Sequence, residues 1–333
     1  YDRSGADVMT GDAADARERT VDGVRVVPVK TIDKKGLAAL SSSYFATKAA
    51  IKDRPDLIHY HAEGPCVPLP LAKRAGIRTA DNIHGLDWQR AKWGKLASTY
   101  IKMGERAAAT KADGLVVLSK SAQSYFHDVY GRTATFIPNG IEPKRPRSAN
   151  QIKEKWGLDE GSYLLYLGRL VPEKRPELLI DALKKLDTNK RLVIAGGGSD
   201  TSEYESSLHE AAQGDPRILF TGFVDGEPLE ELYSNCYAYV LPSDVEGMPM
   251  SLLEAMYAGC PPVARHAPGP DLIIENGISG LLCGTVPELA AALDKTTAAM
   301  GHAAQSRVNE NFLWQNSAEL ALTLLPKKGK ANG

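Results

Sequence analysis

Short apolar segments alternate with longer stretches along the whole chain, and this alternation limits the possible folds more than any other feature. The stretches between most of these segments are about 12 to 20 residues long and have helical character. Such alternation is typical of βαβ units and parallel sheets, and continuously apolar strands indicate sheets covered on both faces. We therefore predict an α/β fold. The segments predicted as strands are 24–29, 56–61, 115–119, 135–137, 163–167, 192–195, 218–220 and 238–241.

The length of the chain predicts two domains. Its 333 residues exceed one ordinary α/β core and match two domains of about 150 residues each. The stretch 138–146 holds three prolines and one glycine, which is more typical of a linker than of a helix or strand. We predict a first Rossmann-like domain over 1–142, a second over 143–302, and a C-terminal segment over 303–333. Two such domains would face each other across a cleft, with ligand-binding residues just after the strands.

Composition argues against several classes of protein. The 40 basic and 41 acidic residues give a net charge of -1, whereas bulk binding of nucleic acid leaves a strongly basic surface. No apolar run approaches the roughly 18 to 20 residues that span a bilayer. The four cysteines are scattered without a C-x-x-C pair, and we predict reduced thiols in a cytoplasmic protein. They are Cys66, Cys236, Cys260 and Cys283.

The strongest chemical signal is the run 246–255, which follows the strand predicted at 238–241. Pro249 suits the first turn of a helix and Gly259 its end. The free amides of that first turn can hold a phosphate. Glu246 in the loop and Glu254 on the helix can then hydrogen-bond sugar hydroxyls. The alternative interpretation is a capping acid and a solvated helix glutamate.

Two further loops follow strands of the second half. In the run 167–176, Gly168 lets the chain turn sharply, and Arg169 and Lys174 can then point into the same cleft. Two cations would stabilise the charge that develops on a departing diphosphate. The glycines at 196–198 allow close approach of the backbone to a ligand. The alternatives are a solvated basic turn and a plain flexible turn.

The first half offers histidines. His84 follows a short predicted strand in the run 82–88 and could reach a reacting sugar, although a lone histidine is more often structural. His59 and His61 form an H-x-H pair, but no third ligand is evident nearby, so we predict no metal site.

Taken in order, these stretches resemble glycosyltransferase family 4, which has the GT-B fold. The resemblance extends over essentially the whole chain. It rests on the E-x7-E pattern from Glu246 to Glu254, the Gly-Arg-Leu-x-x-Glu-Lys-Arg run at 168–175, Pro-Asn-Gly-Ile at 138–141 and Phe-Leu-Trp-Gln at 312–315. The run 84–94 is similar to a bacterial branch of the family often labelled rhamnosyltransferase-like.

The resemblance implies a retaining glycosyltransferase that needs neither a divalent metal nor a cofactor. Its donor would be a nucleoside-diphosphate sugar, and its acceptor a saccharide or a lipid-linked molecule. The product would belong to bacterial cell-surface polysaccharide or glycolipid. The helix around Trp314 would cross back to the first domain.

The resemblance also implies roles for the candidate residues. Arg169 and Lys174 would hold the donor diphosphate, and Glu254 would bind the ribose hydroxyls. Glu246 would bind the donor sugar, and His84 would contact that sugar near the reaction centre. The other donor contacts would come from the glycines after 192–195, from two residues beside the base and from the start of the helix after Glu246. They are Gly196, Gly197, Phe223, Val224, Gly247, Met248, Pro249 and Ser251.

The sequence departs from the family pattern at its start. Family members begin with a strand and a Gly-rich loop, whereas this sequence opens at Tyr1 with Tyr-Asp-Arg-Ser-Gly. We therefore expect an upstream strand and helix to be absent, and the chain to bind donor weakly and transfer poorly. Two other functions stay open. One is another GT-B enzyme, such as a phosphorylase or a sugar-nucleotide epimerase, and the other is a non-catalytic nucleotide-sugar-binding protein.

The stretch 87–111 combines basic and aromatic residues, which suits a peripheral helix at an anionic membrane or a site for a lipid-linked acceptor. The alternative is a solvated helix face with core-facing tryptophans. The residues are Arg90, Lys92, Lys95, Lys102, Arg106 and Lys111, with Trp88, Trp93 and Tyr100 among them.

Overall fold

The structure, a computed structural model, describes residues 18–21, 23–32, 34, 37–89, 93–197 and 202–323. It divides into two compact units. Unit 1 comprises Tyr1–Val117 and Ala122–Thr135, and unit 2 comprises Leu118–Ser121 and Phe136–Gly333. The predicted domain limits at 142 and 302, and the return of the C-terminal helix to the first domain, stay predictions. The expected missing strand concerns residues 1–5 and upstream, which lie outside the described residues.

A parallel sheet forms the centre of unit 1. Its strand order is β3-β4-β5-β6, with β3 (Leu57–His61), β4 (Arg78–Ile83), β5 (Gly114–Val117) and β6 (Thr135–Phe136). The pairs β3–β4 and β4–β5 are parallel, as the alternation of strands and helices predicted. The core packs strand residues such as Ile83 and Val117 against Leu69 and Phe126 of two helices. The helices before β6 are α1 (Ala38–Asp53), α2 (Leu69–Arg74), α3 (Lys95–Lys111) and α4 (Lys120–Tyr130), with short turns η1 (Gly64–Cys66) and η2 (Asp87–Gln89).

The prediction of a strand over 24–29 is wrong in the length of the strand and in the sheet to which it belongs. It appears as β2 (Val24–Val26), which pairs antiparallel with β1 (Arg19–Val21) in a separate two-stranded hairpin. All three residues of β2 are exposed. Gly23, at φ +79, takes the left-handed conformation in the turn between the two strands. An apolar run therefore marked a strand here, but its partner is a neighbouring segment and not the central sheet.

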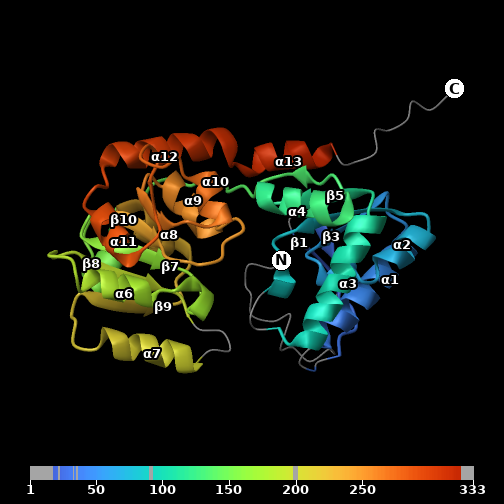
Figure 1. The fold of residues 1–333 in the computed structure, drawn as a ribbon, viewed down its shortest axis with the longest axis horizontal. Coiled ribbons are helices and arrows are strands. Elements are labelled where there is room, and N and C mark those ends of the chain that lie inside the picture. Colours follow the sequence, from blue (N-terminus) through green and yellow to red (C-terminus); the bar gives the residue numbers. More distant parts are fainter. Residues whose placement is uncertain are drawn as a thin grey trace. The chain divides into compact units, whose positions relative to one another are not determined.

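Unit 2 is built on a six-stranded parallel sheet (Figure 1). Its order is β12-β11-β10-β7-β8-β9, so the direction of winding reverses between β7 and β10. This is the doubly wound arrangement, whose ligands bind beyond the strand ends at the point of reversal. The strands are β7 (Tyr163–Leu167), β8 (Arg191–Ala195), β9 (Ile218–Gly222), β10 (Ala238–Leu241), β11 (Pro262–Arg265) and β12 (Leu281–Cys283).

Helices cover both faces of this sheet, which explains why its central strands are apolar without interruption. Along β7, Tyr163 and Leu165 join the core on one face, and Leu164 and Tyr166 the core on the other. The helices on the first face are α5 (Gln151–Trp156), α8 (Gly226–Asn235), α9 (Met250–Tyr257), α10 (Pro268–Ile273) and α12 (Ala298–Asn311). Those on the second are α6 (Glu177–Leu183), α7 (Ser202–Ala212) and α11 (Val286–Leu293).

Two motifs that lie far apart in the sequence pack together within unit 2. The backbone of Ile141 pairs with that of the segment 312–314, where α13 (Trp314–Leu322) begins, through Ile141 N to Phe312 O at 2.9 Å and Trp314 N to Ile141 O at 3.1 Å. A Cβ on Gly140 would lie 2.3 Å from the Trp314 nitrogen, so only glycine permits this approach. The contact gives a physical reason for the Pro-Asn-Gly-Ile run.

The prediction of four reduced thiols is wrong for one pair of cysteines. Cys236 and Cys260, which follow α8 and α9, form a disulfide with Cα atoms 6.3 Å apart. Cys66 and Cys283 are free and buried. The pair is 24 residues apart in sequence, and only the packing of α8 beside α9 brings the two sulfurs into bonding distance.

Candidate functional site

The loops that follow β7, β8 and β9 are joined through their backbones. Gly168 N donates to Ala195 O at 3.1 Å, Leu170 N to Gly197 O at 3.1 Å, and Gly196 N to Gly222 O at 2.8 Å. Gly196 has φ +133, and a Cβ there would lie 1.9 Å from the Gly168 carbonyl oxygen. The glycine at 196 is therefore required by a contact inside the protein. The role of Gly196 and Gly197 in approaching a ligand stays a prediction, and Gly198 lies outside the described residues.

A buried ion pair crosses the point where the sheet reverses. Lys174 ends the turn η3 (Pro172–Lys174) after β7, and its Nζ lies 2.5 Å from Glu246 Oε1 in the loop after β10. The two side chains are 20% and 7% exposed. The structure thus brings together two predicted site residues from strands that are neighbours in the sheet but distant in the sequence. Their charges are held where a ligand of a doubly wound sheet binds.

Arg169 makes different contacts from Lys174. Its guanidinium is half-exposed, and its nearest carboxylate is that of Glu173 at 3.9 Å. Such a pair is screened by solvent and contributes little to stability. Arg169 is therefore free to turn toward an incoming anion at small cost.

A second set of ion pairs, absent from the sequence-based prediction, ties the same two loops together. Asp244 N donates to Glu173 O at 3.0 Å, and Asp244 Oδ2 accepts from Arg175 Nη1 at 2.8 Å. Arg265 of β11 also bonds to Asp244, and Arg175 bonds to Glu177. Arg175 adopts φ 52, the left-handed region. Nothing local in the sequence marks the pairs with Asp244, because Arg175 and Arg265 are 69 and 21 residues away from it in the sequence.

Helix α9 begins one residue later than predicted. Pro249 is its N-cap, with φ -72 and ψ 112, and Met250 is the first helical residue. Gly259, at φ +83, lies just beyond the helix end as predicted. The first-turn amides of a helix have no partner within the helix and carry positive partial charge, so this terminus can accept an anion.

The residues around this terminus are packed closely. A Cβ on Gly269 would lie 2.8 Å from the Gly247 carbonyl oxygen and 2.7 Å from Pro249 Cδ. Met248 is buried. The Ser251 hydroxyl accepts a hydrogen bond from the Tyr239 hydroxyl at 2.7 Å, so its side chain has an internal partner and its backbone amide is the group that could meet a phosphate.

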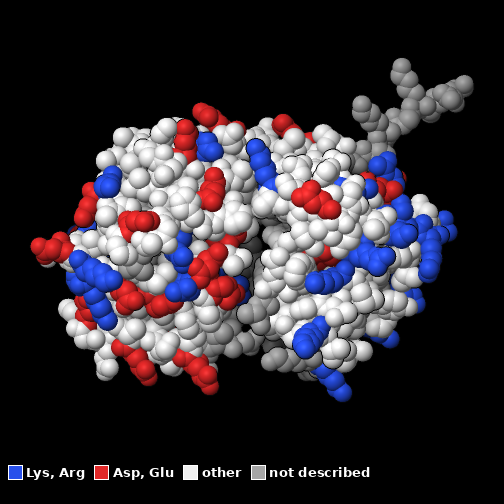
Figure 2. Space-filling model, viewed as in Figure 1, with Lys and Arg blue, Asp and Glu red and all other residues white. Residues whose placement is uncertain are grey.

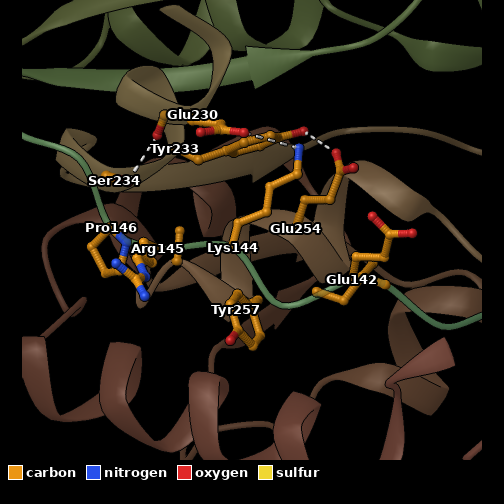
Figure 3. A pocket seen from close by; sticks show the side chains of 11 residues that line it. Glu142, Lys144, Arg145, Pro146, Glu230, Tyr233, Ser234, Glu254 and Tyr257 are labelled. Carbon is orange, nitrogen blue, oxygen red and sulfur yellow. Dashed lines mark hydrogen bonds and ion pairs between the residues drawn. The ribbon is translucent and has the colours of Figure 1, made fainter. Parts of the chain in front are cut away.

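Glu254 points into a pocket of unit 2 (Figure 3). Its Oε2 accepts a hydrogen bond from the Tyr233 hydroxyl at 2.9 Å. Lys144 extends toward the carboxylates of Glu230 and Glu254 (Figure 3), with its Nζ 3.7 Å from Glu230 Oε1. The pocket lining does not include Glu246 or Lys174. It consists of Ile141, Glu142, Lys144, Arg145, Pro146, Glu230, Tyr233, Ser234, Glu254, Tyr257 and Ala258.

The two residues predicted beside a base lie after β9. Phe223 is 82% exposed, which leaves its ring open to a ligand. Val224 packs partly against the core. Their predicted role stays untested.

In unit 1 the predicted residue His84 lies beside the H-x-H pair. His61 Nδ1 and His84 Nε2 are 3.2 Å apart, and the rings of His59 and His61 have centroids 4.5 Å apart. The adjacent parallel strands β3 and β4 bring His84 beside this pair. Burial lowers the pKa of His59 to about 4, and it lowers the pKa of His61 as well. Within the described residues, no group of three or more His, Cys, Asp or Glu has a geometry that could hold a metal ion.

The two halves of the chain match two family models. Residues 6–145 match the model described as Glycosyltransferase Family 4, and residues 148–304 match that of Glycosyl transferases group 1. A glycogen synthase of Mycobacterium tuberculosis is 31% identical over 301 residues, covering 83% of this chain and 70% of that protein. A GDP-mannose-dependent alpha-(1-6)-phosphatidylinositol monomannoside mannosyltransferase of Mycolicibacterium smegmatis is 26% identical over 302 residues, covering 83% of this chain and 78% of that protein.

A solved structure shows the same fold. The crystal structure of Anabaena HepE in complex with UDP and glucose superimposes with a TM-score of 0.75 at 22% identity, covering 87% of this chain and 83% of that chain. This likeness confirms the predicted fold class, GT-B with two Rossmann-like domains.

Proposed function

We propose that this chain, which belongs to glycosyltransferase family 4, transfers a sugar from a nucleoside-diphosphate sugar to an acceptor with retention of configuration. The chain is a glycosyltransferase. The donor class, the stereochemical course and the roles of individual residues are the proposal. The donor class agrees with the UDP and glucose in the HepE crystal structure and with the GDP-mannose dependence of the mycobacterial relative.

The observation that carries this proposal is the Lys174–Glu246 pair, 2.5 Å apart at the reversal point of the sheet. When a glycosidic bond to a diphosphate breaks, negative charge grows on the diphosphate and positive charge on the sugar. A fixed cation and a fixed carboxylate side by side complement these two charges. We assign Lys174, with Arg169 and the amides at the start of α9, to the diphosphate, and Glu246 to the sugar.

The remaining roles follow from position. One carboxylate oxygen of Glu254 would accept hydrogen bonds from the ribose hydroxyls in the pocket of Figure 3. The other, Oε2, accepts the hydrogen bond from the Tyr233 hydroxyl. Phe223 and Val224 would lie beside the base. His84, from unit 1, would contact the donor sugar near the reaction centre.

The direct test is a thermal-shift screen against a panel of sugar nucleotides, followed by transfer assays with the best ligand. A ligand that binds only the native state raises the unfolding temperature by mass action. We expect one donor to stabilise the protein and to be consumed when an acceptor is added. Stabilisation without turnover would contradict the proposal in favour of a non-catalytic binding protein, and release of an isomerised donor without acceptor would favour an epimerase.

Activity should survive EDTA. Lys174 and Arg169 are proposed to provide the positive charge that a divalent ion provides in other transferases, so removal of metal should leave kcat unchanged. The measurement is the initial rate before and after dialysis against EDTA. Loss of activity that is restored by Mg²⁺ or Mn²⁺ would contradict this assignment.

Replacement of Glu254 with alanine should weaken donor binding by roughly 1 to 3 kcal/mol, because the ribose hydroxyls lose a charged acceptor. Calorimetric titration with the donor measures this change. Tyr233→Phe is the matched control, since it removes the hydroxyl bonded to Glu254 and keeps the carboxylate. An unchanged donor affinity in Glu254→Ala would exclude Glu254 from the site.

We also propose that the chain works in the cytoplasm at the inner face of a membrane, where a lipid-linked acceptor would be presented. In the part of the chain that the structure describes, no helix is both long and apolar enough to cross a bilayer. Basic side chains gather on the face of unit 1 where α3 lies (Figure 2). Lys95, Lys102 and Arg106 are exposed along α3, together with Leu96 at 91% and Met103 at 57%.

Two of the three aromatic residues in the predicted membrane-binding stretch, Trp88 and Tyr100, are partly buried. Trp88 donates its indole Nε1 to the buried Glu105 at 2.7 Å, and Lys102 Nζ lies 4.0 Å from its ring centroid. Tyr100 is only partly exposed. The predicted Trp93 is 38% exposed, and Leu96 and Met103, which the sequence-based prediction did not single out, are more exposed. Arg90 and Lys92 lie outside the described residues.

Neutralising two basic residues of α3 should weaken binding to anionic vesicles. At about 1 kcal/mol for each basic residue near the surface, Lys95→Gln with Arg106→Gln should lower the partition coefficient about thirtyfold. Flotation with phosphatidylcholine vesicles, with and without phosphatidylglycerol, measures it. The control is Lys185→Gln with Lys295→Gln, two exposed lysines of unit 2. Equal flotation with both kinds of vesicle would favour a merely solvated helix face.

A further inference from the structure

Two fully buried carboxyl groups lie side by side in unit 1. Glu63 directly precedes η1 and Glu105 lies on α3, with exposed fractions of 0% and 1%. Gly104 makes this approach possible, since a Cβ there would lie 1.8 Å from the Glu63 carbonyl oxygen. The backbone of α3 at Gly104 therefore contacts the backbone at Glu63. The side chain of Glu105, the next residue of α3, is buried beside that of Glu63.

Both carboxyls bind the loop that carries His84. Asp87 N donates to Glu63 Oε2 at 2.9 Å, and Trp88 Nε1 donates to Glu105 Oε2 at 2.7 Å. Asp87 and Trp88 begin η2, directly after the segment that leaves β4. Two successive residues of the loop are thus held by two different elements, within four residues of His84.

The partners of this pair are neutral groups. Besides the amide and the indole, Glu105 Oε1 accepts from the Tyr125 hydroxyl at 2.9 Å and the Tyr130 hydroxyl at 2.6 Å. Within the described residues neither carboxyl forms a salt bridge, and two adjacent buried negative charges would be strongly unfavourable. Glu105 accepts three hydrogen bonds, whereas Glu63 Oε1 has no hydrogen-bond partner among the described residues. Glu63 is therefore the group that keeps a proton.

We propose that Glu63 and Glu105 act together as positioning residues for the His84 loop, with Glu63 protonated in the native protein. The geometry of the pair stands on its own. Its effect on transfer rests on the proposed function, because only there does His84 contact the donor sugar.

A dependence of stability on pH follows. Burial raises the pKa of Glu63, the backbone hydrogen bond from Asp87 lowers it, and the neighbouring acids Asp87 and Glu105 raise it, so that it rises from its ordinary value of 4.5 to about 9. Tyr125 and Cys66 are the other ionisable groups that interact with it, and Arg106 is the cation that acts on nearby Tyr130. The native state thus holds a proton that the unfolded chain releases above 4.5. The associated stability is complete below that pH and is lost as pH rises toward 9.

The first experiment measures urea unfolding from about pH 6 to about pH 9 in wild type, Glu63→Gln and the control Asp128→Asn. Glutamine imitates the protonated acid and cannot titrate, whereas Asp128 is an exposed acid of the same unit. The unfolding equilibrium constant of wild type should rise with pH by up to about tenfold per pH unit more than that of Glu63→Gln. Asp128→Asn should follow wild type. Parallel curves for wild type and Glu63→Gln would overturn the proposal.

The second experiment tests the positioning role with Glu105→Gln and Trp88→Phe. Trp88→Phe removes the donor and leaves the carboxyl pair intact, so it serves if Glu105→Gln does not fold. Both should lower kcat by about tenfold to a hundredfold through displacement of the loop and leave donor affinity unchanged. The Trp88 indole N–H resonance should also move in Glu105→Gln. Folded variants with wild-type kcat would overturn the positioning role.

The two hypotheses can fail separately. If wild-type protein transfers no sugar to any acceptor, the proposed function fails, and the unfolding curves and the indole resonance still decide whether the carboxyl pair holds the loop. If transfer is normal, and neither the unfolding curves nor the indole resonance changes in the variants, the positioning role of the carboxyl pair is overturned and the proposed function stands.

Discussion

Lys174→Ala should lower kcat by about a hundredfold to a thousandfold, the usual cost of losing one group that stabilises developing negative charge. Lys174 is mostly buried beside Glu246, where the effective dielectric is low and its charge is little screened. The effect should appear in kcat more than in KM, because the diphosphate becomes more negative as the glycosidic bond breaks. Arg169→Ala should change the same parameter by a smaller factor, since its guanidinium is half-exposed.

Single-turnover and steady-state kinetics with calorimetric donor affinities separate these contributions. Lys185→Ala, at an exposed lysine just after α6, controls for loss of one charge. Lys174→Ala also leaves Glu246 buried without its cation, which can destabilise the fold. The double variant Lys174→Met with Glu246→Gln keeps a neutral, similarly sized pair. If this pair unfolds like wild type and shows only a higher KM with unchanged kcat, then both residues serve uniform binding and not catalysis.

Gly196→Ala should destabilise unit 2 by roughly 2 to 5 kcal/mol, from backbone strain and steric overlap together. The added Cβ would lie 1.9 Å from the Gly168 carbonyl oxygen, and the residue must keep φ +133. Relief requires the loop after β7 to move, and that loop carries Arg169 and Lys174. Donor affinity should therefore fall along with stability.

Gly197→Ala is the matched control for this change. A Cβ at Gly197 would meet nothing within 4 Å, and its φ lies outside the left-handed region. Its cost should stay within about 1 kcal/mol. Urea unfolding of both variants, with donor titrations, provides the comparison. Equal stability of the two would mean that the contact with Gly168 does not restrict position 196.

Features encoded by local sequence were predictable. The alternation of apolar segments and helical stretches located β7 and β10 to the residue, because a strand covered on both faces must be apolar throughout. The placement of candidate residues just after strands followed from the same pattern, since loops at the carboxyl ends of parallel strands share one edge. The GT-B fold class rested on motifs that keep their order along the chain.

The tertiary structure alone decided which of these segments meet. Strand order in unit 2 places β7 beside β10, and so Lys174 meets Glu246 across 72 residues of sequence. The same holds for the Cys236–Cys260 disulfide, for His61 beside His84, and for the carboxyls of Glu63 and Glu105 around Trp88. An apolar strand has similar affinity for several neighbours, so its own residues specify burial but not its partner. The choice of partner minimises the free energy of the whole packed core, and a local pattern cannot express it.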